Sequence, residues 1–140
     1  MPNRAFLDSN VFIFAFERPG SNSEKIVSWL VNGELTGTVT DRVVREVMRY
    51  FRRYYGKDLA AKFRDIILLT CEFILEEDLT IPQTFVDQVG KKDAGAVAAV
   101  RDRSLSCLVS TDSDFEGLPE HRTPRAFVQE RAGRARPGEE

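Results

Sequence analysis

Residues 4–16, RAFLDSNVFIFAF, form the stretch that decides the fold. Apolar side chains fill it on both sides of one polar tripeptide, DSN, so the run should be buried. Residues 4–7 are predicted to form a short strand that ends at Asp8, and Ser9 or Asn10 is predicted to cap the short apolar helix that follows. Burying a carboxylate without a partner is costly, so Asp8 requires compensation from elsewhere in the chain.

The composition is that of a globular protein outside the membrane. The chain has 140 residues, of which 42% are apolar and 30% charged, which suits one domain with one core. The longest apolar run is too short for a membrane helix and lacks a signal-peptide cleavage site. Cys71 and Cys107 lie far apart and are expected to be reduced thiols. We therefore expect a cytoplasmic protein whose domain spans residues 1–130, followed by a flexible tail at 131–140.

Helices and short buried strands alternate along the chain. Strands are predicted at 4–7, 37–40 and 107–110, and helices at 21–31, 41–55, 58–70, 83–89 and 93–103. Residues 71–81 are ambiguous between strand and helix. The alternation predicts an α/β domain with a mostly parallel sheet.

The single histidine restricts the chemistry that the chain can perform. His121 lies between prolines in PEHRTP and is predicted to be a solvated loop residue. One histidine cannot supply a HExxH or Cys2His2 zinc site, and no GxSxG motif accompanies it. A net charge of −2 does not favour a protein that coats nucleic acid, although local charge decides such binding. Any catalysis must therefore use carboxylates, hydroxyls and cations.

Acidic residues follow two of the predicted strands. Asp8 comes directly after the first strand, while Asp112 and Asp114 follow the strand at 107–110. Because binding sites in open parallel sheets lie beyond the carboxyl ends of the strands, these carboxylates should meet at one edge. Each aspartate alone would be explained equally well as a helix cap or turn residue.

Glu46 lies on the predicted helix at 41–55, DRVVREVMRYFRRYY. On a helical wheel one face of this helix is apolar, with Val44, Val47, Met48, Phe51, Tyr54 and Tyr55. Arginines gather on the opposite face with Glu46 at their edge: Arg42, Arg45, Arg49, Arg52 and Arg53. Two interpretations stay open for this face. Glu46 could pair with arginines on a solvated surface, or arginines 42, 45, 49 and 53 could contact RNA phosphates beside an acidic site.

Asp93 opens a helix that is slim because of its alanines and one glycine, DAGAVAAV. Such a helix can pack closely against the sheet and bring Asp93 near the same edge. The simpler explanation is an aspartate stabilised by the positive end of the helix dipole.

Together these residues predict a metal site. Several carboxylates cannot all stay ionised side by side without a cation, since their repulsion raises their pKa values. Mg²⁺ and Mn²⁺ prefer oxygen ligands, and one or two such ions could be held by Asp8, Glu46, Asp93 and Asp112. Such ions can orient a water, favour its hydroxide form and neutralise charge on a phosphodiester.

The motifs resemble those of the PIN-domain (PilT N-terminus) nucleases, and within them the VapC-type ribonuclease toxins. FLDSNVFI is similar to the family's opening strand, TDRVVREVMRY to its [ST]-x5-E element, and KKDAGAVAAV to its DA-x3-A helix start. LVSTDSDFEGLP is similar to the LVT-x-D-x-DF strand end, and TPRAFV to the closing TP-x-x-F. The five motifs occur in the family's order.

This resemblance implies a three-layer α/β/α sandwich and an endoribonuclease dependent on Mg²⁺ or Mn²⁺ that cleaves single-stranded RNA. Asp8, Glu46, Asp93 and Asp112 would be its metal ligands, Asp114 an auxiliary ligand, and Asn10 and Thr40 polar supports. Toxins of this kind typically bind an antitoxin protein and form homodimers. Only EHR stands at residues 120–122, where the family has its last short strand, so that edge strand is expected to be reduced or missing.

Three other functions remain alternatives. A solitary RNA-processing nuclease would have the same residues. A haloacid-dehalogenase-like phosphatase would use Asp8 as a covalent nucleophile, but that class has D-x-D where this chain has Asn10 at the second position. A non-catalytic binding module would be expected to have lost some of the acidic residues.

Overall fold

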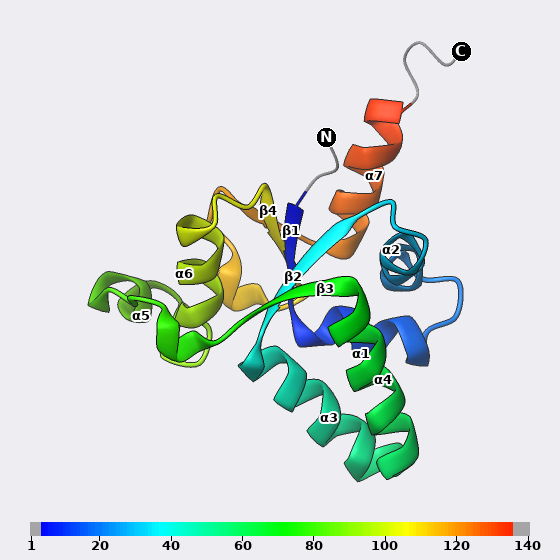
Figure 1. Cartoon of the computed structure of the whole chain (residues 1–140). Coiled ribbons are helices and arrows are strands. Elements are labelled where there is room, and N and C mark those ends of the chain that lie inside the picture. Colours follow the sequence, from blue (N-terminus) through cyan, green and yellow to red (C-terminus); the bar gives the residue numbers. More distant parts are fainter. Residues whose placement is uncertain (1–3, 136–140) are drawn as a thin grey trace.

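The computed structural model of the protein describes residues 4–135, and a parallel sheet lies at their centre (Figure 1). Its five strands are β1 (Arg4–Leu7), β2 (Thr36–Thr40), β3 (Cys71–Ile74), β4 (Cys107–Val109) and β5 (His121–Arg122), in the order β3-β2-β1-β4-β5. Every neighbouring pair is parallel. The sequence runs outward from β1 in both directions across the sheet, so β1 lies where the strand order reverses, the usual place for a binding crevice.

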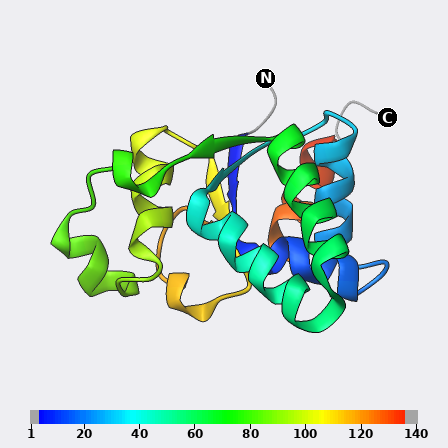
Figure 2. The same ribbon diagram turned by 60° about the horizontal axis from the view of Figure 1, so that its bottom comes forward.

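Helices cover both faces of this sheet, as Figure 2 shows. They are α1 (Ser9–Glu17), α2 (Asn22–Val31), α3 (Asp41–Tyr55), α4 (Lys57–Thr70), α5 (Gln83–Val89), α6 (Ala94–Asp102) and α7 (Pro124–Ala135). Helices α5 and α6 lie on one face, and α1, α2, α3, α4 and α7 lie on the other. The predicted α/β/α sandwich is therefore confirmed.

The stretch at 4–16 lies in the middle of the core, as its apolar content predicts. Phe6, Leu7, Val11 and Phe12 are fully buried. Since a buried residue of this kind contributes about 2 kcal/mol, the run anchors both β1 and α1. The helix cap differs from our prediction. Asp8 itself caps α1, because its Oδ1 accepts the backbone N–H of Ser9 at 2.8 Å.

The middle of the chain, which the sequence left ambiguous, contains an edge strand and a short 3-10 turn. Strand β3 occupies the start of the ambiguous segment, and the 3-10 turn η1 (Glu76–Asp78) follows it. The Glu76 carboxylate packs where a Cβ at Gly95 would lie. Its two oxygens both accept from Arg42 Nε, each at 3.3 Å. The slim face of α6 thus makes room for η1.

The C-terminal part bears on three predictions. The last edge strand is present as β5 and is reduced to two residues. His121 belongs to this strand rather than to a solvated loop, and its Nε2 lies 2.9 Å from the Ser110 carbonyl oxygen. Residues 131–135, expected in the tail, continue α7, while 136–140 lie outside the described residues.

Helix α3 has the predicted bounds, but its buried face is shifted by part of a turn. Val43 is buried, although it was not expected on the apolar face. Tyr54 and Tyr55 are exposed, and the Tyr55 hydroxyl donates to Glu17 Oε2 at 2.9 Å. The aromatic end of α3 is therefore a polar surface contact with α1.

No helix among residues 4–135 combines the length and apolar content needed to cross a membrane.

Candidate active site

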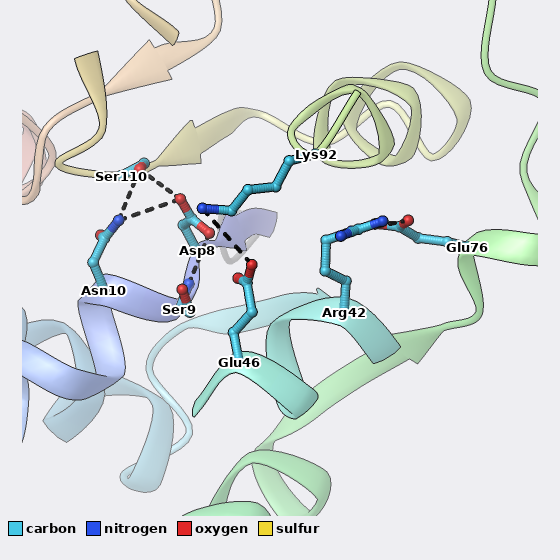
Figure 3. A network of polar contacts seen from close by, with 8 residues as sticks. All are labelled: Asp8, Ser9, Asn10, Arg42, Glu46, Glu76, Lys92 and Ser110. Carbon is cyan, nitrogen blue, oxygen red and sulfur yellow. Dashed lines mark hydrogen bonds and ion pairs between the residues drawn. The ribbon is translucent and has the colours of Figure 1, made fainter. Parts of the chain in front are cut away.

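The strand register brings the acidic segments together at the carboxyl edge of the sheet. Leu7 of β1 pairs with Val109 of β4, and the Asp8 N–H donates to the Val109 carbonyl oxygen at 3.1 Å. Asp8 and Ser110 consequently lie side by side where their strands end. Helices α3 and α6 begin at the same edge and contribute Glu46 and Asp93. Figure 3 shows Asp8, Glu46 and Ser110 around this point.

The Asp8 carboxylate is buried and accepts three hydrogen bonds, from two residues of α1 and from Ser110 at the end of β4. Its Oδ2 accepts the Ser110 hydroxyl at 2.7 Å and the Asn10 side-chain amide at 3.3 Å, while its Oδ1 serves the α1 cap. Burial nevertheless raises the pKa of Asp8, and the nearby Asp112 charge raises it further, against the opposing effect of the Ser110 hydrogen bond. The costly charge inferred from the sequence is real and only partly compensated by the chain.

Ser110 is a site residue that sequence reasoning missed. Its fully buried hydroxyl donates to Asp8 and accepts from the Asn10 amide at 3.1 Å and from the Asp112 N–H at 3.0 Å. One donor and two acceptor positions are all in use, so the hydroxyl joins β1, α1 and the Asp112 turn. The sequence carried no signal for this role, because it depends on the register that pairs Leu7 with Val109 and so places Ser110 beside Asp8.

Asn10 completes this network, in agreement with its predicted position as a polar support. Its Oδ1 accepts the Thr111 N–H at 3.1 Å, while its amide reaches Asp8 and Ser110. The segment 110–112 is thereby fixed against α1.

Glu46 faces the acidic edge rather than the arginines of its own helix. Its closest cation is Lys92, whose Nζ lies 3.9 Å from Glu46 Oε2 (Figure 3). Burial raises the pKa of Glu46, and the Asp8 charge adds to the effect. Pairing with Arg42, Arg49 or Arg53 is therefore not what holds Glu46. Lys92, which the sequence reasoning passed over, is the residue just before Asp93.

Asp93, Asp112 and Asp114 form the most compact part of the acidic edge. One carboxylate oxygen from each lies within 4.8 Å of the others. Burial raises the pKa of Asp93 to about 7, and the charges of Asp112 and Asp8 contribute to the rise. Asp93 occupies the cap position of α6, yet its side chain makes no capping hydrogen bond. The structure brings Asp114 nearer to this group than its auxiliary place in the prediction suggested, while Asp8 and Glu46 lie outside the compact group.

Thr40 lies at the end of β2 but does not support the acidic residues through a hydrogen bond. It occupies the cap position of α3 without a side-chain capping bond. Its buried hydroxyl is the one buried side-chain oxygen or nitrogen among the described residues that lacks a hydrogen-bond partner.

The arginines of α3 divide into two groups. Arg42 pairs with Glu76 at 3.3 Å and Arg45 pairs with Asp41 at 2.8 Å. Arg49 and Arg53 form no ion pair within the described part of the chain, and they line a groove of about 470 Å³ together with Arg45, Met48 and Arg52. The cations available for a phosphate thus lie toward the middle and end of α3.

The donor set fits a hard divalent cation. The candidate ligands are carboxylate oxygens, which Mg²⁺ and Mn²⁺ prefer, and Lys92 is the one ammonium group close to them among the described residues. Burial raises the pKa values of Asp8, Glu46 and Asp93, and repulsion from neighbouring carboxylates adds to each rise, so a cation would favour their ionised forms.

Comparison with solved structures identifies proteins of the same fold. A toxin–antitoxin complex from Klebsiella pneumoniae is 20% identical, with a TM-score of 0.58, and the match covers 86% of this chain and 97% of the other. VapBC2 from Rickettsia felis, bound to a DNA fragment from its promoter, is 16% identical at a TM-score of 0.62, covering 86% and 98%. VapC20 from Mycobacterium tuberculosis, a sarcin–ricin loop cleaving toxin, is 15% identical at 0.57, covering 83% and 95%.

These structural matches establish a shared fold over most of each chain. The predicted resemblance to VapC-type proteins is confirmed at the level of the fold. No protein-family model matches the sequence, and a sequence search of curated proteins gives no match.

Proposed function

We propose that the protein is a divalent-metal-dependent endoribonuclease that hydrolyses phosphodiester bonds in single-stranded RNA, and that it is the toxin of a toxin–antitoxin pair. The observation that carries this proposal is the convergence of Asp8, Glu46, Asp93 and Asp112 at one sheet edge, in a fold shared with toxin structures. Among the described residues, neither the single histidine nor the two cysteines belongs to the compact group of carboxylates.

The acidic residues would hold one or two Mg²⁺ or Mn²⁺ ions. Asp93, Asp112 and Asp114 would ligate from the compact side, and Asp8 and Glu46 from the strand β1 and helix α3 side. When bound, the ions would favour the hydroxide form of a bound water and neutralise charge on the phosphodiester.

The remaining residues would orient and bind. Ser110 and Asn10 keep the Asp8 carboxylate directed toward the acidic edge. Lys92 offers Glu46 a counter-charge. Arg49 and Arg53 are free to bind RNA phosphates, whereas Arg42 and Arg45 would first have to leave their carboxylate partners.

We also propose an antitoxin partner and a homodimer. The neighbouring structures include toxin–antitoxin complexes. A groove of about 820 Å³ between α1, α2 and α4, lined by Phe16, Trp29 and Val31 among others, offers an apolar surface for a protein partner. Leu68 and Leu69 on α4 and Phe73 on β3 are exposed and could serve self-association. Co-expression with a small DNA-binding protein encoded next to this chain, followed by co-purification and mass measurement of the complex, tests both.

Asp8→Asn tests the enzymatic proposal. Asparagine retains an oxygen that can cap α1, so the fold should survive. It removes one charge from the ligand set. Since replacing even a partner behind a metal ligand costs about 10–100-fold, we expect cleavage of single-stranded RNA in Mg²⁺ or Mn²⁺ to fall by at least about 100-fold.

Asp58→Asn is the matched control, because Asp58 is an exposed aspartate in the first turn of α4 and far from the acidic residues in the chain. Full cleavage by the Asp8→Asn protein would refute the assignment. A phosphorylated Asp8 trapped in the wild type would point instead to a phosphatase, and absence of Mn²⁺ binding at millimolar concentration would point to a non-catalytic module.

A further inference from the structure

A second charged region adjoins the acidic edge. It is a cleft of about 250 Å³ between the end of α1, the start of α2 and the start of α7. Its lining includes Phe14, Arg18, Asn22, Thr111, Thr123 and Arg125, and no aspartate or glutamate. We refer to it as the arginine cleft.

The two arginines of the cleft are not neutralised by the rest of the chain. Arg18 and Arg125 form no ion pair in the described structure, whereas arginines elsewhere, such as Arg101 and Arg122, pair with glutamates. The surrounding lining supplies hydroxyl and amide groups rather than carboxylates. The cleft therefore carries two positive charges that are available to bind an anion.

Arg18 is held in a defined orientation. Its guanidinium lies over the Phe14 ring, 3.9 Å from the ring centroid. This stacking covers one flat face of the guanidinium and leaves the N–H groups at its edge available. A guanidinium fixed in this way is suited to bind two phosphate oxygens at once.

The arginine cleft is joined to the acidic edge by a short segment of backbone. Thr111 lines the cleft, and it stands between Ser110, which binds Asp8, and Asp112. The Thr111 N–H is held by Asn10 Oδ1 at 3.1 Å, so the segment has a fixed path between the two regions. An extended strand whose scissile phosphate lies at the acids can therefore continue directly into the cleft.

The chemistry of the cleft favours an RNA backbone over other anions. Two guanidiniums suit phosphodiester oxygens, and the hydroxyls of Thr111 and Thr123 could contact ribose 2′-hydroxyls. Thr123 Oγ1 also accepts the Ala126 N–H at 3.1 Å, which keeps it in place at the start of α7. An acidic peptide is the other class of partner that the charges would admit.

We propose that the arginine cleft is a subsite for the RNA substrate, in which Arg18 and Arg125 bind backbone phosphate next to the scissile bond. This inference rests on the proposed ribonuclease function and adds a path for the substrate. The strand would leave the acidic edge toward α7, on a side different from the arginine groove of α3.

Equilibrium binding to a fluorescent single-stranded RNA of 12 nucleotides would test the subsite. All proteins carry Asp8→Asn so that the RNA stays intact, and fluorescence anisotropy is followed over a range of salt concentrations. We expect Arg18→Gln/Arg125→Gln to weaken RNA binding by about 10-fold. The slope of log K against log salt should fall in magnitude by about 1–2, because each phosphate contact that is lost reduces the number of counterions released on binding.

Arg64→Gln/Arg103→Gln is the matched control, because it removes two exposed arginines elsewhere that pair only with the neighbouring aspartate. Arg18→Lys/Arg125→Lys retains the charge but loses the planar fork, and should weaken binding by about 3-fold without changing the salt slope. The lysine protein also serves as the test if the glutamine protein does not fold.

Three outcomes would overturn the subsite. They are RNA binding by the glutamine protein that is as tight as that of the control protein, no RNA binding by the Asp8→Asn protein, and loss of binding to an oligo-glutamate peptide alone in the cleft variants. The last result would assign the cleft to a protein partner. Failure of the ribonuclease proposal is judged separately, from RNA cleavage by the wild-type protein. If the wild-type protein cleaves RNA and the cleft variants bind RNA normally, only the subsite proposal is wrong.

Discussion

The two halves of the acidic edge differ in what holds their carboxylates in place. Asp8 is fixed by the hydroxyl of Ser110, the amide of Asn10 and a backbone N–H. Asp93 has no capping bond, and its neighbours are the carboxylates of Asp112 and Asp114. One half is thus organised by the protein itself, whereas the other needs protons or a cation. Under the proposed function, a cation would complete the site from the α6 side.

Ser110→Ala should break the organised half and have the largest effect on stability. It removes the donor to Asp8 and leaves the Asn10 amide and the Asp112 N–H with one acceptor fewer. Because losing a partner of buried polar groups costs about 1–3 kcal/mol, we expect the free energy of unfolding to fall by about 2 kcal/mol. Urea denaturation measures it directly.

Ser28→Ala on the exposed side of α2 is the control for loss of a serine hydroxyl. Equal stability of the two serine variants would show that the Asp8 half does not depend on its hydrogen bonds and would remove the contrast between the halves.

The α6 half should respond to metal and pH. The pKa of Asp93 is about 7 in the folded protein, above the ordinary value of 3.8. Without metal, this carboxyl group therefore favours the folded state over the unfolded state at low pH. That contribution is lost as the pH rises from about 4 through 7, where deprotonation exposes the repulsion. A cation binds the deprotonated form, and its stabilising effect should therefore grow over the same range.

The measurement is the unfolding midpoint with and without 10 mM Mg²⁺ at pH 5 and pH 7.5. If the dissociation constant is about 1 mM, Mg²⁺ adds about 1.4 kcal/mol at pH 7.5, which corresponds to a few degrees, and much less at pH 5. The same shift with Ca²⁺ in a protein carrying Asp93→Asn would be contrary to this expectation, since the variant lacks the titrating carboxylate.

Thr40→Val should have the smallest effect and the opposite sign. The Thr40 hydroxyl is buried without a partner, so a methyl group of similar size removes an uncompensated polar atom. We expect the metal-free protein to become more stable by about 0.5–1 kcal/mol. RNA cleavage in Mg²⁺ should nevertheless fall if this oxygen acts at the metal site. Thr36→Val at the start of the same strand, where the residue is half-buried, provides the control. A destabilised Thr40→Val protein would indicate a hydrogen bond at this hydroxyl.

The positions of the acidic residues could be anticipated because the sequence determines where strands end. A buried strand followed at once by an aspartate occurs at Asp8 and near Asp112, and parallel strands bring such ends together. Glu46 needed a separate argument, because the helical wheel of α3 placed it at the edge of the arginines and left two interpretations open. These inferences use local patterns and one general property of parallel sheets.

Ser110 and Lys92 could not be found in this way. Nothing in CLVS distinguishes the serine from the end of an ordinary strand, and its importance arises from a register that pairs residues about a hundred positions apart. Lys92 is next to Asp93 in sequence, but its contact with Glu46 depends on how the turn before α6 lies relative to α3. The unexpected exposure of Tyr54 has a similar cause, because a wheel gives a helix its apolar face but not its neighbours.

The contact between Glu76 and Gly95 has a consequence for how this sequence can change over generations. The Glu76 carboxylate occupies the space that any side chain at position 95 would need, while it binds Arg42. A larger residue at 95 therefore requires the Glu76 carboxylate to move from its present position, and a smaller residue at 76 would remove that requirement. In a library of random variants, Gly95→Ala should recover with Glu76→Ala or Glu76→Ser more often than with changes elsewhere, so the two positions are expected to vary as a pair.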